Sequence, residues 1–165
     1  MSGLDGFTEA LDPPMYVVTA VAADGERAGC LVGFASQCSI NPARFTVWLS
    51  RKNHTYGVAC RSSHLAVHVL SRTRMETARL FGEETGEEID KFARVDWTPG
   101  HGGVPVLSDA SAWFVGRVET RWDGGDHVGF LLDPVAEGSS VPPAAEQPGL
   151  LCLSDVAHFS PGHPA

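Results

Sequence analysis

The residues best suited to bind a ligand lie in one stretch, from Arg27 to Pro42, which reads RAGCLVGFASQCSINP. The stretch is apolar enough to be buried, yet it carries two glycines, two serines and a glutamine. Buried polar side chains need hydrogen-bond partners, and a strand of the core seldom holds so many of them. A bound ligand would supply the partners, so we predict a ligand-binding segment here.

A second candidate site follows, from Arg51 to Thr55, and reads RKNHT. Asn53 is suited to cap a helix that runs to about Arg61. Two cations beside a helix N-terminus combine side chains, free N–H groups and the macrodipole into an anion site. A capped surface helix with ordinary charges is the alternative for the same residues.

The other groups of potentially reactive residues do not lead to a predicted site. His64 and His68 have the spacing of a helical metal pair, but we expect residue 68 on a strand and find no further ligand, so no metal site is predicted. Ser36 and Ser39 lack a Gly-x-Ser-x-Gly elbow, and we find no nucleophile–base pair for a hydrolase. The four cysteines lack Cys-x-x-Cys spacing, which argues against zinc and against a disulfide framework. We interpret the four tryptophans as core or dimer contacts.

The length and the net charge of the chain limit the classes of protein to which it can belong. A chain of 165 residues is expected to form one domain, over residues 1–165, with a flexible tail at 160–165. Acidic residues outnumber Lys and Arg by eight, so we expect no nucleic-acid partner. The chain has no apolar run of the ~20 residues that a membrane span needs and no signal-peptide pattern. We expect a cytoplasmic protein with reduced thiols and no membrane partner.

The elements that must position these residues are mostly strands. We predict strands at 15–21, 45–50, 65–70, 111–122, 128–135 and 150–153, with the Arg27–Pro42 stretch as a further strand and a bend. Short helices are expected at 6–11 and 53–61, and after the capping boxes that begin at Thr73 and Thr85. Residues 97–103 and 138–149 are interpreted as loops. This pattern favours a mainly β fold, a closed antiparallel barrel with a few short helices, over a βαβ sheet.

The order of several motifs resembles the flavin reductase-like family, the FMN-binding split barrels. Gly29, Ser39 and Pro42 match its segment Asn-Gly-x-Thr-x-x-x-x-x-Ser-x-Ser-x-x-Pro-Pro. Ala28, Leu31 and Gln37 depart from it, because they replace the usual Asn, Thr and first Ser. Further matches, within a resemblance that covers about residues 11–135, are Phe81-Gly82, Lys91-Phe92 and Gly125-Asp126-His127.

The resemblance implies a split β-barrel that passes hydride from NADH or NADPH to FMN or FAD, works as a homodimer and can serve as the reductase component of a two-component monooxygenase. It places His127 near the flavin, where, over the open ring face, it would contact the nicotinamide or the flavin carbonyl. The backbone of the bend would hold the ring edge, and polar residues would hold the ribityl chain and phosphate. The cofactor-binding residues expected in this way are Leu31, Val32, Gly33, Phe34, Ala35, Ser36, Cys38, Ser39, Lys52, Asn53, His54, Thr55 and Lys91.

The departures at Leu31 and Gln37 leave other outcomes open. The barrel would then bind a related cofactor, a deazaflavin or haem, or would bind flavin without reducing it. A non-enzymatic split barrel with an empty pocket, acting as a binding or dimer module, is a further alternative. The sequence does not distinguish FMN from FAD or NADH from NADPH.

Overall fold

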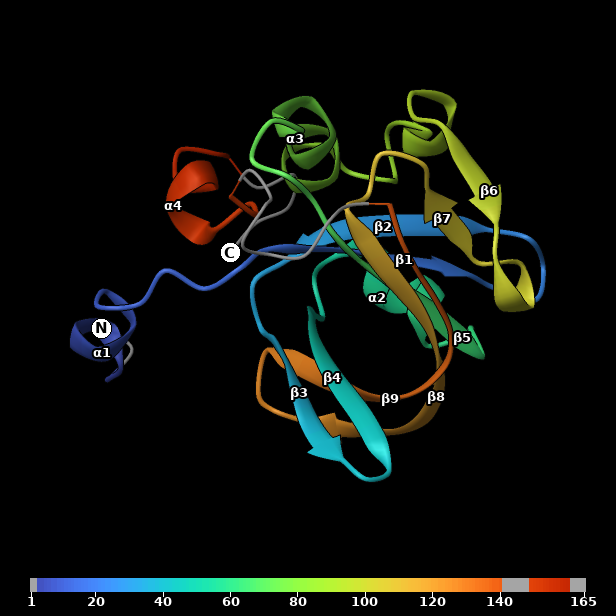
Figure 1. Ribbon diagram of the computed structural model, residues 1–165, viewed down its shortest axis with the longest axis horizontal. Coiled ribbons are helices and arrows are strands. Elements are labelled where there is room, and N and C mark those ends of the chain that lie inside the picture. The colour runs from blue at the N-terminus through green and yellow to red at the C-terminus, as the bar shows by residue number, and fades with distance from the viewer. Residues whose placement is uncertain (1–2, 141–148, 161–165) are drawn as a thin grey trace.

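The fold is built around one large antiparallel sheet (Figure 1). It was obtained as a computed structural model, which describes residues 3–140 and 149–160. Seven strands pair in the order β2-β1-β5-β8-β9-β4-β3, and β6 and β7 form a separate hairpin. The strands are β1 Tyr16–Val21, β2 Arg27–Val32, β3 Ala35–Ile40, β4 Ala43–Ser50, β5 His64–Val69, β6 Trp97–Pro99, β7 Pro105–Leu107, β8 Ala112–Asp123 and β9 His127–Ser139.

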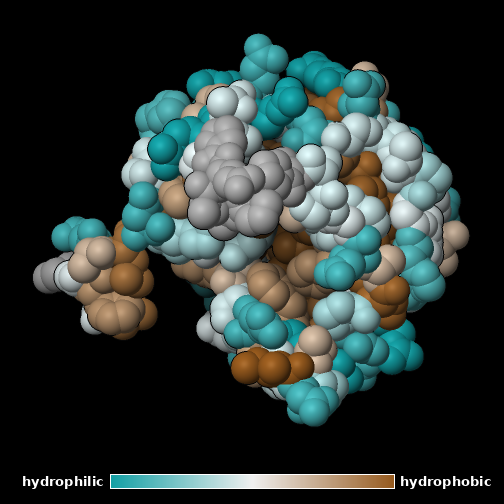
Figure 2. Space-filling view, viewed as in Figure 1, coloured by the Kyte–Doolittle hydropathy of each residue, from teal (hydrophilic) through white to brown (hydrophobic). Residues whose placement is uncertain are grey.

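The helices are short. They are α1 Asp5–Thr8, α2 His54–Ala59, α3 Met75–Glu83 and α4 Leu153–Val156, with 3₁₀ helices η1 Lys91–Ala93 and η2 His101–Gly103. In Figure 1, α3 and α4 lie together at one end of the molecule, whereas α1 stands apart from the body. Figure 2 shows that α1 carries apolar surface, to which the exposed Phe7 belongs. None of the helices in the described part of the chain has the length and apolar character that a membrane crossing needs.

Two hydrophobic clusters cover the two faces of β1. Val18 and Ala20 belong to a cluster inside the curved sheet, with Phe130 and Leu132. Val17 faces the other way, into a cluster that includes residues of α3, η1 and α4. Alternate residues of a strand point to opposite faces, so the apolar run of β1 is explained by burial on both sides. The predicted buried strand at this position is confirmed.

The predicted closure of the barrel is not confirmed. The hydrogen-bonded ladder ends at β2 on one side and at β3 on the other, although the two strands are joined through Gly33 and Phe34. The edge of β2 is covered instead by the segment that carries η1, because the Lys91 Nζ donates to the Gly29 carbonyl at 2.9 Å. The mainly β, antiparallel character with few short helices is confirmed.

Several predicted boundaries were wrong. Thr73 does not cap α3: the N-cap position is Arg74, without a side-chain bond, and the Thr73 hydroxyl pairs with that of Ser71. The Thr85 pattern forms a turn, and the short helix there is η1, capped by Asp90. In both places the threonine hydroxyl forms a hydrogen bond with a residue two positions away and does not cap a helix.

The two predicted loops and the last predicted strand also need correction. Residues 97–103 contain β6 and η2 and lead into β7 rather than forming a plain loop. Residues 150–153 form isolated bridges, of which one pairs Pro14 with Cys152, and Leu153 begins α4. The predicted 138–149 loop begins as the end of β9. Most of that segment, and residues 161–165 of the predicted tail, lie outside the described residues.

Candidate active site at the open edge of the sheet

The bend at Gly33 and Phe34 lies where the sheet is open, between its two end strands. In an antiparallel strand the N–H and C=O of one residue point to the same side, and alternate residues point to opposite sides. Because the Gly29 carbonyl faces the open edge, the backbone of Leu31 faces it too. Within the predicted ring-edge segment, Leu31 therefore presents a backbone donor and acceptor to this edge, whereas Val32 pairs with β1 and Ala35 pairs with β4.

The side chains near this edge offer a ligand fewer polar groups than the residues of the family motif would offer. Val32 is buried in the sheet interior, and the Leu31 side chain packs against Gly82 of α3. The Gln37 amide donates to the Ser39 carbonyl at 3.0 Å, so it folds back on its own strand. At Leu31 and Gln37, both departures from the motif, the side chain is engaged within the protein.

A hollow of about 360 Å³ lies on the β3 side of the bend. We call it the β3 groove. Cys38 is fixed there by a contact of 3.3 Å between its Sγ and the Thr46 hydroxyl, and the Phe34 carbonyl accepts from the Trp48 N–H at 2.9 Å. The lining is formed by Phe34, Ala35, Ser36, Cys38, Thr46, Trp48 and Trp122. The structure thus brings four of the predicted residues together.

His127 reaches the same bend from the start of β9. It pairs with Ser50 of β4, and the centroid of its ring lies 5.0 Å from that of Phe34. Its Nδ1 is 2.7 Å from the Asp126 carboxylate, and this hydrogen bond lowers the pKa of the Asp126 carboxyl. The Gly-Asp-His motif therefore holds one ring nitrogen of His127, with the ring beside the bend.

The start of α2 forms the third part of the region. Asn53 is the N-cap, as predicted, and its side chain accepts from the Thr55 N–H at 2.9 Å. Thr55 is buried, and its hydroxyl is directed to the Cys30 thiol rather than outward. Lys52 is an exposed cation whose charge lowers the pKa of the Asp126 carboxyl. Of this predicted anion-binding group, the side chain of Lys52 is thus the one best placed for a phosphate.

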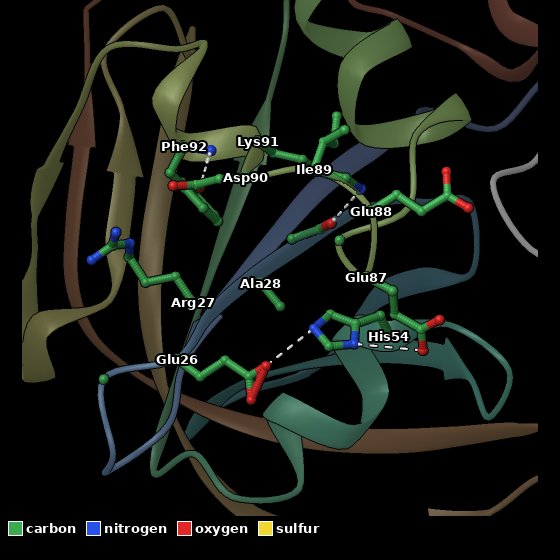
Figure 3. Close-up of a pocket in the computed structure, with 13 residues that line it drawn as sticks. Glu26, Arg27, Ala28, His54, Glu87, Glu88, Ile89, Asp90, Lys91 and Phe92 are labelled. Atoms are coloured by element: carbon green, nitrogen blue, oxygen red, sulfur yellow. Dashed lines mark hydrogen bonds and ion pairs between the residues drawn. The ribbon is translucent and has the colours of Figure 1, made fainter.

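His54 and Lys91 belong to a second hollow, of about 430 Å³, along the first half of β2 (Figure 3). We call it the β2 pocket. Its walls are the β2 edge, His54 of α2 and the segment 86–92. The His54 Nε2 is 3.3 Å from a Glu26 carboxylate oxygen, and its Nδ1 is 3.9 Å from one of Glu87. His54 therefore has carboxylates on both sides, which makes it a poor partner for a phosphate.

The sequence analysis missed Glu26 and Glu87 of the β2 pocket and Trp48 and Trp122 of the β3 groove. Their positions depend on chain segments that are distant in sequence. The structure shows why a glycine stands opposite Trp48: a Cβ added at Gly129 would lie 2.9 Å from the Trp48 ring. The glycine near the Gly-Asp-His motif therefore makes room for a large ring.

The two histidines with metal-pair spacing do not form such a pair. His68 is buried; its Nδ1–H donates to the Val17 carbonyl at 2.9 Å, and its Nε2 accepts from the Leu107 N–H at 3.1 Å. His64 lies beside His101, with ring centroids 4.9 Å apart. The described residues contain no cluster of three or more side chains suited to a metal ion.

The open antiparallel sheet, with a bend between its two end strands and a histidine against that bend, defines a class of small β proteins with a split sheet. The sequence model of the flavin reductase like domain matches residues 9–152, and the chain belongs to that family. The predicted resemblance is confirmed.

Individual relatives agree with this assignment. The "Probable flavin reductase" of Rhizobium meliloti is 32% identical over 112 residues, which are 68% of this chain and 35% of that protein. The chain thus spans about a third of that relative's length. The reductase subunit HsaB of a flavin-dependent monooxygenase from Mycobacterium tuberculosis is 28% identical over 134 residues, 79% of this chain and 70% of HsaB. The FMN-binding protein of Thermus thermophilus shares the fold, with a TM-score of 0.80 and 23% identity over 92% of this chain and 86% of that one.

Proposed function

We propose that this protein is a flavin reductase that uses NADH or NADPH to reduce FMN or FAD. The observation that carries the proposal is the position of the Gly33–Phe34 bend at the open side of the sheet, with His127 against it, in a chain of the flavin reductase like family. When bound, the flavin supplies the chemistry, because it accepts a hydride from the nicotinamide. The protein has to hold the ring, place the nicotinamide and keep water away.

The residues at the bend fit a flavin. Its ring edge needs fixed donors and acceptors, and the backbone around Leu31 and Gly33, between the pairing of Val32 with β1 and that of Ala35 with β4, would supply them. Phe34 is 61% exposed and offers an apolar surface. The β3 groove, which Phe34 lines, measures about 360 Å³, within the range of about 300–1,000 Å³ of small-molecule sites.

The polar groups divide the remaining tasks. Ser36, Cys38 and Ser39 lie along β3 and would follow the ribityl chain. Lys52 would contact the phosphate, while Asn53 and Thr55 hold the start of α2 in place. His127 would donate or accept at Nε2 toward the nicotinamide, since Asp126 holds its Nδ1. Direct hydride transfer needs no proton relay, so no further acid–base pair is required.

Assembly and partners extend the proposal. The protein would act as a homodimer and deliver reduced flavin to a monooxygenase, the role that the name of HsaB gives to that relative. Two further statements stay predictions. One is that residues 1–165 form one domain, and the other is that the protein works in the cytoplasm. The described cysteines are all unpaired, which agrees with reduced thiols.

Binding without reduction is the second candidate. It is favoured by the engagement of Leu31 with Gly82 and of Gln37 with Ser39, which leaves fewer side-chain contacts to tune a bound ring. A deazaflavin or haem at the same bend belongs to this alternative.

An anaerobic titration tests the proposal. Purified protein is titrated with FMN and with FAD, and NADH or NADPH is then added while the visible flavin absorbance is followed. Binding followed by bleaching at a catalytic rate is the expected result. Dithionite serves as the control, because it shows that the bound flavin can be reduced. Bleaching by dithionite but by neither nicotinamide would leave a flavin-binding protein, and no binding of either flavin would contradict the proposal.

A further inference from the structure

The turn that carries the Gly-Asp-His motif has little packing to fix its shape. It joins β8 to β9, and the Asp126 side chain within it is 90% exposed. The φ of Gly125 is +113°, and a Cβ added there would meet no atom within 4 Å. The Asp126 carboxylate nevertheless holds the His127 Nδ1 at 2.7 Å. Hydrogen bonds, rather than packing, therefore have to keep this turn in place.

Arg51, which directly follows β4, makes three contacts with the turn. Its backbone N–H donates to the Asp126 carbonyl at 2.9 Å, and its Nε donates to the Gly125 carbonyl at 3.1 Å. Its Nη2 lies 3.0 Å from the Asp123 carboxylate, which also accepts from the Gly125 N–H at 3.0 Å. The Gly125 N–H and the Arg51 guanidinium together lower the pKa of the Asp123 carboxyl. One arginine thus links the end of β8 to the two residues that precede His127.

The contacts of Arg51 are better suited to fixing geometry than to adding stability. The side chains of Arg51 and Asp123 are 42% and 76% exposed, and an exposed ion pair contributes little to folding. A guanidinium donates from a rigid planar fork, so it can hold a carbonyl and a carboxylate in one fixed arrangement. A shift of the turn would move Asp126 and release the His127 ring.

We propose that Arg51 is a positioning residue for the nicotinamide site, because it holds the turn in the shape from which Asp126 orients the His127 ring. The inference rests on the proposed function, in which His127 contacts the nicotinamide. In this role Arg51 contacts neither the flavin nor the nicotinamide. A ring that is already oriented loses less freedom when the nicotinamide binds, so the loss of Arg51 weakens nicotinamide binding only through His127.

The first test uses two variants with opposite changes in charge. Arg51→Met removes the side-chain contacts and keeps the backbone N–H, and Asp123→Asn keeps an acceptor for the Gly125 N–H but loses the charge that pairs with Arg51. Both should raise the KM for NADH about fivefold, the effect of about one hydrogen bond, with kcat and FMN affinity little changed. A direct effect of charge on the anionic NADH would change KM in opposite directions in the two variants.

The second test is a double-mutant cycle with His127→Ala. Because Arg51 acts through His127, adding Arg51→Met to His127→Ala should change the KM for NADH by no more than about 1.5-fold. A general loosening of the structure would instead raise KM by the same factor in both backgrounds.

Arg61→Met is the matched control. Arg61 pairs with Asp24 in the turn between β1 and β2, and Asp24 accepts from the Glu26 N–H in the way that Asp123 accepts from the Gly125 N–H. This variant therefore removes an equivalent arginine from a turn that carries no part of the proposed nicotinamide site. Its KM for NADH should equal that of the wild type.

The outcomes separate this inference from the proposed function. If the wild type reduces flavin, a fivefold loss that persists in the His127→Ala background, or opposite changes in the two single variants, would overturn the role of Arg51 alone. Weaker binding of FMN but not of riboflavin in Arg51→Met would also overturn it, because Arg51 would then contact the phosphate. Failure of the wild type to reduce flavin would overturn both. If Arg51→Met does not fold, Asp123→Asn alone and combined with His127→Ala decides in the same way.

Discussion

At the scale of single residues, His127 illustrates how neighbours limit what a side chain can do. Asp126 engages its Nδ1 at 2.7 Å, and Phe34 contacts one side of its ring. If Nε2 orients the nicotinamide, His127→Ala should raise the KM for NADH or NADPH about tenfold, the effect of one lost hydrogen bond. Steady-state kinetics and an FMN titration measure this. FMN affinity should stay within about twofold, and an unchanged KM would remove His127 from the site.

Lys52 permits a separate test at this scale, since a phosphate distinguishes FMN from riboflavin. Lys52→Met should weaken FMN about tenfold, as expected for a lost charge-assisted bond, and leave riboflavin binding unchanged. Fluorescence titrations with both ligands give the two dissociation constants. Arg72→Met is the control, because Arg72 pairs with Asp155 near α4. Equal losses for both ligands would show that the phosphate lies elsewhere.

At the scale of elements, the contact between β2 and α3 depends on a glycine. A side chain added at Gly29 would lie 2.7 Å from the buried Phe81 ring, whereas one added at Gly57 of α2 meets nothing within 4 Å. Gly29→Ala should therefore cost about 1–3 kcal/mol of unfolding free energy through overpacking. Gly57→Ala should add about 0.5–1 kcal/mol, because alanine favours the helix. Urea unfolding of both variants measures the two changes in unfolding free energy. An unchanged unfolding free energy in Gly29→Ala would show that Phe81 can move.

The elements also show what the sequence could predict. The strands of the large sheet and the Asn53 cap follow from local patterns, because alternation and capping depend on near neighbours. That the sheet stays open between β2 and β3 could not be predicted in this way. Lys91 covers the edge of β2 by donating to the Gly29 carbonyl, a contact between segments far apart in sequence. The same holds for His54, whose position beside Glu26 and Glu87 removes it from the predicted phosphate group.

At the scale of the whole molecule, stability should depend on pH through His68. This buried ring joins three strands, because it lies on β5 and bonds to Val17 of β1 and to Leu107 of β7. Burial lowers the pKa of His68 to about 4, against about 6.5 in the unfolded chain. Above pH 6.5 both states are neutral there and His68 contributes no pH dependence. Below it the unfolded chain binds a proton that the folded protein does not, so stability falls as pH drops from about 6.5 to about 4.

The size of this effect can be measured against a variant that keeps both hydrogen bonds. His68→Gln can donate to the Val17 carbonyl and accept from the Leu107 N–H, but it does not titrate. Between pH 7 and pH 4.5 the wild type should lose about 2–3 kcal/mol more unfolding free energy than His68→Gln, from the pKa difference. Denaturant unfolding at several pH values gives both curves. Parallel curves would mean that the proton is accommodated in the folded state, and that the packing around β1, β5 and β7 opens more readily than the burial of His68 implies.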